Sequence, residues 1–242
     1  RRPERRAASM RSAASGDIPL SVKLRLGKDR RSINIIENAK IAEDNGASLI
    51  AVHCRTAADS YETEPDWTWL RKVKESVNID VIGNGSVFNP QDALKMYDET
   101  GCDSIMVGRG AIGNPFLFAR YNTLVEEGYD PGHPDIDIAC TVLLRHIDLL
   151  RKEFGDDVAL NKAKKNSIWY LQFYNGINEY LQSVFSVKSI EDLNKLVADH
   201  CGRIKGSLVP SDEKDEIYRK FKKRILFWLD EENEKLVACT TK

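Results

Sequence analysis

Four glycine-rich or cationic features recur along the first half of the chain, each within or directly after a short apolar segment. In chain order they are Lys23, His53-Cys54-Arg55, Gly83-Asn84-Gly85 and Gly108-Arg109-Gly110. Glycine-rich turns expose backbone N–H groups to an anion, and an arginine adds a charge-assisted hydrogen bond. Each feature alone has a structural explanation, such as a tight turn or a solvent-facing side chain. The four together indicate a site for a phosphate-bearing cofactor.

The segments that carry these features alternate with segments of helical periodicity between residues 18 and 128. The predicted strands are 19–27, 48–54, 80–85 and 104–110. The predicted helices are 33–46, 66–77, 89–101 and 114–128. Asp66 and Asn89 suit the N-caps of two of these helices. Four β/α units predict a parallel sheet with helical cover, and such sheets bind ligands at the carboxyl ends of their strands.

The second half of the chain shows no convincing strand pattern. Residues 129–137 hold two prolines and a glycine and predict a linker. Helical spacing follows in 138–155, 163–185, 189–202 and 211–237. The last of these has an apolar stripe, made of Ile217, Phe221, Ile225, Trp228 and Leu229. We therefore predict two domains, over 1–128 and 136–242, of which the second is all-helical.

Composition excludes some classes of protein. The 242 residues are 42% hydrophobic and 30% charged, which suits a packed core, and the formal net charge of -1 excludes a polycation. No apolar run approaches the roughly 18 residues of a membrane span. The five cysteines form no C-x-x-C pair, so we expect neither a metal site nor a disulfide framework. We interpret the chain as part of an intracellular, cytoplasmic protein.

A basic segment beside aromatic residues, 162–165, has the composition of an RNA-contacting surface. The aromatic residues that follow it at helical spacing are Trp169, Tyr170, Phe173 and Tyr174. Composition alone favours the structural interpretation, in which these aromatic side chains belong to a core. A second basic run, 219–224, is flanked by acidic residues, and we expect it to be a solvated helix face.

The motifs resemble those of one family in order and spacing. The segments SVKLRLG, VHCRTAADSY…PDW, VIGNGSVFNPQDA and TGCDSIMVGRGAIGNPFLF are similar to tRNA-dihydrouridine synthases, particularly bacterial-type members. The likeness covers about residues 18 to 200. It implies an α/β fold, the C-terminal half of a (β/α)8 TIM barrel, followed by an all-α tRNA-binding domain. It also implies an FMN flavoprotein that uses NADPH to reduce uridine in tRNA to dihydrouridine.

The resemblance also implies roles for particular residues. Lys23 and His53 match the lysine and histidine with which the family contacts the flavin. The residues that match its phosphate-binding segments are Asn84, Gly85, Ser86, Gly108 and Arg109. The residues expected to contact RNA are Arg55, Lys164 and Lys165. A lysine cation near the pyrimidine end of a flavin would stabilise the anionic reduced form.

The sequence departs from the family pattern in three places. His-Cys-Arg at 53–55 replaces the usual His-Gly-Arg, and Asn166 stands where a histidine is usual. The first half of the barrel is absent, and with it a catalytic cysteine followed by proline; none of the five cysteines here precedes a proline. We therefore assign no catalytic residue. We expect the C-terminal part of a longer protein, whose partner is the missing N-terminal half-barrel.

Two alternatives remain open at this point. One is a catalytically inactive RNA-binding remnant, which the missing cysteine and the missing half-barrel favour. The other is a different FMN-dependent TIM-barrel oxidoreductase that acts on a small molecule. The basic and aromatic helical segment argues for tRNA, since an enzyme of small molecules does not need it. The sequence does not identify the uridine that is modified.

Overall fold

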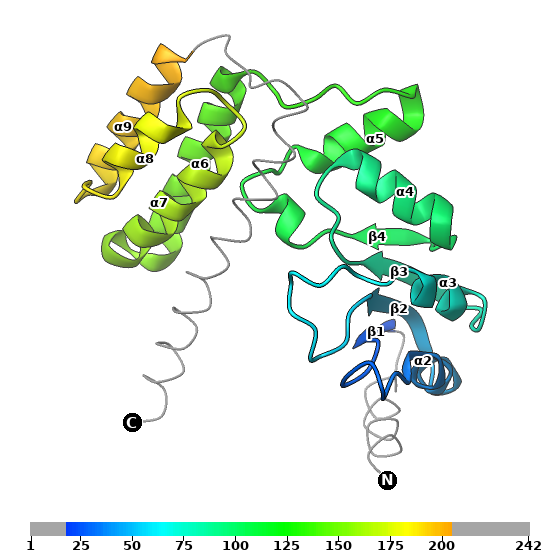
Figure 1. The fold of residues 1–242 in the computed structure, drawn as a ribbon. Helices are drawn as coiled ribbons and strands as arrows, with labels where there is room; N and C mark the ends of the chain where they lie inside the picture. The colour runs from blue at the N-terminus through cyan, green and yellow to red at the C-terminus, as the bar shows by residue number, and fades with distance from the viewer. Residues whose placement is uncertain (1–17, 205–242) are drawn as a thin grey trace, which may run out of the picture. The chain divides into compact units, whose positions relative to one another are not determined.

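The computed structural model describes residues 18–204, and its elements are shown in Figure 1. Within these residues the chain forms two compact units, which we describe separately. The first unit comprises residues up to Ala111 together with Leu117–Asp130. The second unit comprises Ile112–Phe116 and the residues from Pro131 onward. The predicted domain limits, 1–128 and 136–242, include residues outside the described range and stay a prediction.

The first unit is built on a parallel sheet of four strands. In chain order they are β1 (Leu20–Arg25), β2 (Ala47–His53), β3 (Asp80–Asn84) and β4 (Ser104–Met106). The strands lie side by side in that same order, with β1 and β4 at the two edges in Figure 1. Sequential parallel strands of this kind require crossover connections, and each is supplied by a helix. The parallel sheet predicted from the β/α alternation is thus confirmed, and it fits part of a TIM barrel, as the family resemblance implies.

Four helices belong to this unit: α2 (Ile35–Asp44), α3 (Thr68–Lys74), α4 (Pro90–Thr100) and α5 (Leu117–Glu127). Alternate side chains of the strands pack with α2, α3 and α4 in one apolar core. Ile50, Val52 and Val81 are fully buried in it. Because side chains on a strand alternate between faces, the residues between these point to the other face of the sheet. Lys23, Ala51 and Ile82 share that second face.

Gly83 lies on the core face, and its lack of a side chain lets two helices approach the sheet. A Cβ atom at this position would lie 2.6 Å from Leu70 Cδ2 on α3 and 2.6 Å from Met96 Sδ on α4. Both neighbours are fully buried. The first glycine of Gly83-Asn84-Gly85 is therefore required by packing within the core.

In the first unit, the predicted helix starts hold to within three residues. The Asn89 side chain accepts the Asp92 N–H at 2.7 Å, and Pro90 takes the first position of α4, as predicted. The helix predicted over 66–77 begins later, at Thr68, and Trp67 takes the N-cap position. The Asp66 carboxylate nevertheless accepts the Thr68 N–H at 3.1 Å. The fourth strand is shorter than predicted and is followed by a 3₁₀ turn, η1 (Arg109–Ala111).

The described part of the second unit contains α6 (Ile136–Phe154), α7 (Asp156–Leu171), α8 (Ile177–Val184) and α9 (Ile190–Arg203). Leu143, Ile147, Leu193 and Val197 are fully buried between them. The segment 163–185, predicted as one helical run, is broken between α7 and α8. Gly176, at φ +79, adopts the left-handed conformation at this break. The apolar stripe predicted over 211–237 and the basic run 219–224 lie outside the described residues.

The aromatic residues of α7 and of the turn after it are core residues, as their composition alone favours. Trp169, Tyr170, Phe173 and Tyr174 are each at most 5% exposed. Gly113 packs directly on this cluster, since a Cβ there would lie 2.3 Å from Trp169 Cβ. The Tyr174 hydroxyl donates to the Pro134 carbonyl at 2.7 Å. These side chains therefore do not form an exposed stacking surface.

Two kinds of feature are not found among the described residues. Of the helices in residues 18–204, none is long and apolar enough to cross a membrane. Within the same range, no cluster of three or more His, Cys, Asp and Glu side chains is arranged to hold a metal ion.

Candidate functional site

A pocket of about 200 Å³ opens in the first unit at the carboxyl ends of its strands. It is lined by Lys23, Arg25, His53, Arg55, Tyr61, Asn84, Gly85, Ser86, Val87, Phe88, Gly108 and Arg109. The structure thus brings together all seven residues predicted to hold a cofactor. It also places Arg55, predicted to contact RNA, in the same pocket. Four lining residues were not predicted: Arg25, Tyr61, Val87 and Phe88.

The register of the sheet explains why these side chains meet. Arg25 pairs with His53, His53 with Asn84, and Asn84 with Met106. Lys23 is two residues before Arg25, so both side chains point to the same face of β1. Each of these positions falls at or near the carboxyl end of its strand. Residues paired across the four strands therefore lie together at the end of the sheet where the pocket opens.

The pocket is strongly cationic. Four of its lining side chains, Lys23, Arg25, Arg55 and Arg109, carry positive charge, and none of the lining residues is Asp or Glu. Burial, and then the neighbouring Arg25 charge, lower the pKa of Lys23 from its ordinary value. Among the described residues that line the pocket, no carboxylate offsets these charges. Such a site favours a ligand that carries negative charge.

His53 is held neutral by this environment. Its side chain is only 7% exposed, and burial is the main cause that lowers its pKa from 6.5 to about 4. The positive charges of Arg25, Lys23, Arg55 and Arg109 act in the same direction. A neutral imidazole keeps one nitrogen as donor and the other as acceptor. His53 can therefore donate a hydrogen bond at physiological pH without carrying charge.

Arg55 is buried beneath the pocket, with 2% of its surface exposed. Its guanidinium donates to the Thr63 carbonyl at 2.6 Å, to the Tyr61 carbonyl at 3.4 Å and to Ser86 Oγ at 2.8 Å. The fourth contact, at 3.4 Å, joins Nη1 to His53 Nε2. The buried guanidinium holds the loop between β2 and α3 against the pocket wall. The predicted RNA contact of Arg55 stays a prediction.

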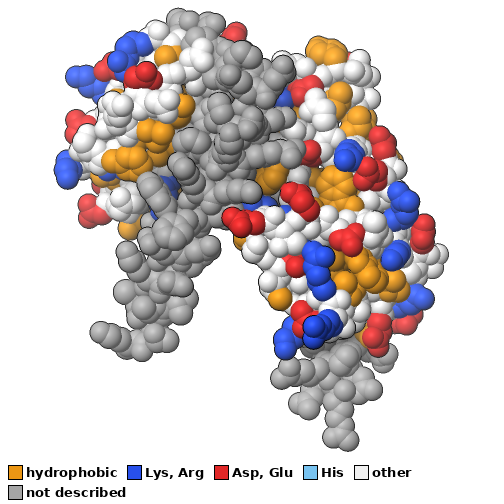
Figure 2. All heavy atoms as spheres, viewed as in Figure 1, with side chains coloured by type: hydrophobic (Ala, Val, Ile, Leu, Met, Phe, Trp, Pro, Cys, Tyr) orange, Lys and Arg blue, Asp and Glu red, His pale blue; other side chains and the backbone are white. Residues whose placement is uncertain are grey.

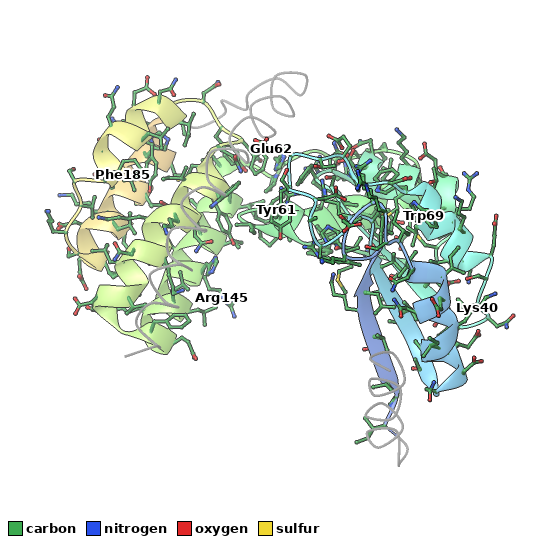
Figure 3. The ribbon with its side chains drawn as sticks, turned by 60° about the horizontal axis from the view of Figure 1, so that its bottom comes forward. Lys40, Tyr61, Glu62, Trp69, Arg145 and Phe185 are labelled. Carbon is green, nitrogen blue, oxygen red and sulfur yellow. The ribbon has the colours of Figure 1, made fainter. Side chains whose placement is uncertain are left out.

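Arg109 makes cation–π contacts with two aromatic rings. Its guanidinium carbon is 4.3 Å from the centre of the Tyr61 ring and 5.3 Å from the centre of the Phe88 ring. Tyr61 belongs to the β2–α3 loop and is labelled in Figure 3. Cation–π contact with the two rings restricts the position of the guanidinium. Tyr61 and Phe88 lie in loops without periodicity, so the sequence offers no signal for this role.

The backbone of the pocket wall is shaped for close approach. Gly85 has φ +143, and Ser86, at φ +54, is the one residue other than glycine with positive φ among those described. In the part of the chain that the structure describes, no hydrogen bond uses the backbone N–H of Gly85, Ser86 or Gly108. Strained conformations cluster at ligand sites, and adjacent N–H groups of this kind form anion-binding concavities.

The loops after β3 and β4 form a single wall. A Cβ at Gly110 would lie 2.2 Å from the Val87 carbonyl oxygen, so the two loops touch through their backbones. A Cβ at Gly108, by contrast, would meet no atom of the described residues within 4 Å. The Asn84 side chain donates to the Met106 carbonyl at 2.7 Å and ties β3 to β4. The Trp67 indole donates to the Gly85 carbonyl at 3.2 Å from outside the pocket.

The cysteines of the first unit have the properties of core residues. Cys54 and Cys102 are each 1% exposed and belong to the apolar core. Burial raises the pKa of the Cys54 thiol to about 12. The Cys54 side chain therefore replaces the usual glycine without entering the pocket lining. Neither cysteine has the exposed thiol of a reactive residue.

The two lysines predicted to contact RNA lie on α7 in the second unit, and both are partly buried. Lys164 Nζ donates to the Val187 carbonyl at 2.6 Å and to the Phe185 carbonyl at 3.5 Å. Lys164 thus fixes the turn between α8 and α9. Phe185, which is 49% exposed, is labelled in Figure 3. The predicted RNA contacts of Lys164 and Lys165 stay predictions.

The fold and the pocket together define a class: a parallel α/β protein with a cationic ligand pocket at the carboxyl ends of its strands. Comparison with known proteins identifies the family within that class. The family model described as Dihydrouridine synthase (Dus) matches residues 4–202. The chain therefore belongs to the dihydrouridine synthase family.

Individual relatives support the same assignment. A "Probable tRNA-dihydrouridine synthase" from Mycobacterium tuberculosis is 34% identical over 192 residues, which are 79% of this chain and 49% of the relative. A "tRNA-dihydrouridine synthase B" from Pasteurella multocida is 36% identical over 155 residues, 64% of this chain and 47% of the relative. The chain spans about half the length of the curated relatives that it matches.

Proposed function

We propose that this chain is the flavin- and tRNA-binding part of a tRNA-dihydrouridine synthase, which reduces uridine to 5,6-dihydrouridine with FMN and NADPH. The observation that carries the proposal is the pocket itself. Four cationic side chains and a neutral histidine converge at the carboxyl ends of the strands of a dihydrouridine synthase fold. The names of the relatives support tRNA as the substrate.

The residues present fit the phosphate of FMN. Gly85, Ser86 and Gly108 line the pocket with backbone N–H groups that make no hydrogen bond within residues 18–204. Arg109, which contacts two aromatic rings, adds a positive charge beside them. The empty space next to Gly108 leaves room for an anion to approach the backbone. These features match those with which proteins bind phosphate groups.

Lys23 and His53 would take different roles toward the ring system of the flavin. Bound FMN would supply the hydride transfer between NADPH and the uracil ring. Lys23 would place a positive charge where negative charge accumulates, as its position on the cationic face of β1 allows. His53 would donate a hydrogen bond without changing its charge, since its pKa is lowered to about 4.

The pocket wall seen here is one side of the proposed flavin site. We propose that the other side is the N-terminal half of the barrel, which carries the family's cysteine. The catalytic residue is therefore not assigned. The inactive RNA-binding remnant remains the second candidate, because Cys54 and Cys102 are buried core residues and no cysteine of the chain precedes a proline. Lys164 and Lys165 are the proposed tRNA contacts in either case.

The test is genetic and chemical. The gene is deleted in its source organism, and dihydrouridine in purified tRNA is measured by mass spectrometry. We expect the modification to be lost at one or more positions and restored by the intact gene. The Lys23→Ala and Arg109→Ala variants should fail to restore it, whereas Lys40→Ala, on the exposed surface of α2, should succeed. Unchanged dihydrouridine in the deletion strain would contradict the proposal.

The second candidate is separated by the same strains together with the purified protein. An inactive remnant would bind tRNA in a salt-sensitive manner but would leave the dihydrouridine content of the deletion strain unchanged. It would also lack the yellow colour of a bound flavin. A flavin spectrum from the purified protein, with loss of dihydrouridine in the deletion strain, excludes this candidate.

A further inference from the structure

Arg55 is a buried cation whose hydrogen bonds all go to neutral groups. Only 2% of its surface is exposed. Among residues 18–204, no carboxylate lies within ion-pair distance of its guanidinium. Burying a charge without an ionic partner costs free energy. The hydrogen bonds of Arg55 must therefore hold its neighbours in a specific arrangement. The contacts of Arg55 with His53 and Ser86 show what that arrangement is.

The contact with His53 determines where the imidazole carries its proton. A guanidinium has five N–H donors and no acceptor. The bond of 3.4 Å between Arg55 Nη1 and His53 Nε2 therefore requires Nε2 to be the acceptor. In a neutral imidazole the proton then resides on Nδ1. Within the described residues, no hydrogen bond uses Nδ1. The Nδ1 atom is also not fully buried. Nδ1 is therefore open to the pocket.

We propose that Arg55 is a positioning residue, which fixes His53 in the neutral tautomer that carries its proton on Nδ1. The pocket thereby receives a permanent hydrogen-bond donor at that atom. Its use toward a flavin or a uracil rests on the proposed function. The tautomer itself is a property of the protein without ligand. His53 consequently donates a hydrogen bond and not a proton.

The charged groups around His53 also favour its neutral form. The charged groups that act on it are Arg25 and Lys23 on β1, Arg55 after β2, and Arg109 after β4, and all four are cations. A proton added to the imidazole would be a fifth positive charge in one pocket. It would also remove the acceptor of the Arg55 bond and leave two donors facing one another. Both effects act against the imidazolium form.

The same guanidinium fixes the phosphate-facing loop. Arg55 Nη2 donates to Ser86 Oγ at 2.8 Å, and Ser86 is the residue at φ +54. Arg55 Nε and Nη2 also hold the carbonyls of Thr63 and Tyr61 in the β2–α3 loop. One side chain thus joins the histidine to both neighbouring loops. A planar fork can make these bonds simultaneously, whereas a lysine ammonium cannot.

The test is nitrogen NMR of histidine side chains in the full chain without ligand. His53→Gln identifies the His53 signals among those of the four histidines. We expect an unprotonated Nε2 and a protonated Nδ1, unchanged as the pH is lowered through 6.5, the ordinary pKa of histidine. A protonated Nε2 in the neutral form, or titration at the ordinary pKa, would overturn the proposal. This wild-type measurement needs no variant to fold.

Variants then assign the effect to Arg55. Arg55→Met removes both the donor and the charge, so His53 should exchange between tautomers and its pKa should rise. Arg55→Lys keeps the charge but not the fork, and should lose the single tautomer. Ser86→Ala is the matched control, since it removes another partner of Arg55 and should leave the His53 tautomer intact. An unchanged tautomer in Arg55→Met, with native amide dispersion, would also overturn the proposal.

These readouts separate the inference from the proposed function. A protein that shows the expected tautomer but leaves tRNA unmodified would contradict the function alone. A protein that modifies tRNA but carries its proton on Nε2 would contradict the positioning role alone.

Discussion

The histidine at the end of β2 has a lowered pKa that couples the stability of the first unit to pH. His53 binds its proton near pH 4 in the folded state and near 6.5 when unfolded. Between these values the unfolded chain binds more protons. The free energy of unfolding must therefore fall as the pH is lowered through this window, and His53 contributes nothing to the pH dependence above it.

This effect can be measured by urea denaturation at a series of pH values. We expect the wild type to lose stability from about pH 6.5 down to about pH 4. The His53→Gln variant should show a flatter curve, with a difference in slope of up to about 1.4 kcal/mol per pH unit. Parallel curves for the two proteins would show that His53 titrates normally in the folded state.

Adding a single methyl group at Gly108 tests the proposed phosphate site. An added Cβ would meet no atom of residues 18–204 within 4 Å, so Gly108→Ala should fold with nearly unchanged stability. The methyl group would, however, occupy space next to a backbone N–H of the pocket. We expect the affinity for FMN to fall by about tenfold, which corresponds to about 1.4 kcal/mol. Titration of the flavin by fluorescence measures this.

The matched control for that substitution is Gly202→Ala on α9. A Cβ there also meets no atom of the described part of the chain within 4 Å, but Gly202 belongs to the second unit. Its flavin affinity should equal that of the wild type. If both variants bind flavin equally well, Gly108 does not adjoin the bound anion.

At the scale of elements, the close approach of α3 and α4 to β3 depends on one glycine. Gly83→Ala would place a Cβ 2.6 Å from Leu70 Cδ2 and from Met96 Sδ. Because both side chains are fully buried, neither can move freely, and overpacking of this kind costs about 1–3 kcal/mol. Chemical denaturation should show that loss, and Gly202→Ala again provides the control. A stability equal to the wild type would mean that the helices can separate from the sheet without cost.

Most elements could be predicted because their periodicity reflects burial. The apolar alternation in 19–27 matches the burial alternation of β1, and Asn89-Pro90 marks the start of α4. The fourth strand was predicted too long because Val107-Gly108 continues the apolar run. There the backbone turns so that Gly110 can pack against the Val87 carbonyl. Close contact between two loops leaves no local pattern.

The helical segment 163–185 shows a similar limit. Its spacing predicts one continuous run, yet it is broken between Leu171 and Ile177. Asn175-Gly176 is the local signal that could have located the break, because Gly176 takes the left-handed conformation. The reason for the break lies in distant residues, since a Cβ on Gly176 would contact His200 and Ile204 at 3.2 Å.

The residues of the site could be predicted where strand position fixes them. Lys23, His53 and Asn84 follow from the ends of successive strands. Arg25 could have been included, because it lies two residues after Lys23 and so on the same face. Tyr61 could not, since its position over Arg109 depends on the bonds that fold the β2–α3 loop.

At the scale of the whole molecule, the pocket contrasts with the overall charge. The chain has a formal net charge of -1, and Figure 2 shows cationic and anionic side chains interspersed over the visible face of the described residues. Four cations without a lining carboxylate are therefore a local feature. Salt should therefore weaken the binding of an anionic ligand to this pocket by screening its cations.

We expect the affinity for FMN to fall as ionic strength rises, and the affinity for riboflavin, which lacks the phosphate, to change little. Arg109→Ala should reduce the salt dependence for FMN, because it removes one charge at the phosphate wall. Lys40→Ala, on the exposed surface, should leave that dependence unchanged. Equal salt dependence for the two flavins would place the phosphate away from the four cations.

The hydrogen bond from Trp67 to the Gly85 carbonyl has a practical consequence for such measurements. The indole lies outside the pocket, yet it is bonded to the peptide that forms part of its wall. Indole emission responds to changes in its hydrogen bonding, so a ligand that shifts this peptide alters the fluorescence of Trp67. The protein thus contains its own optical reporter, and ligands without colour can be detected with no added dye.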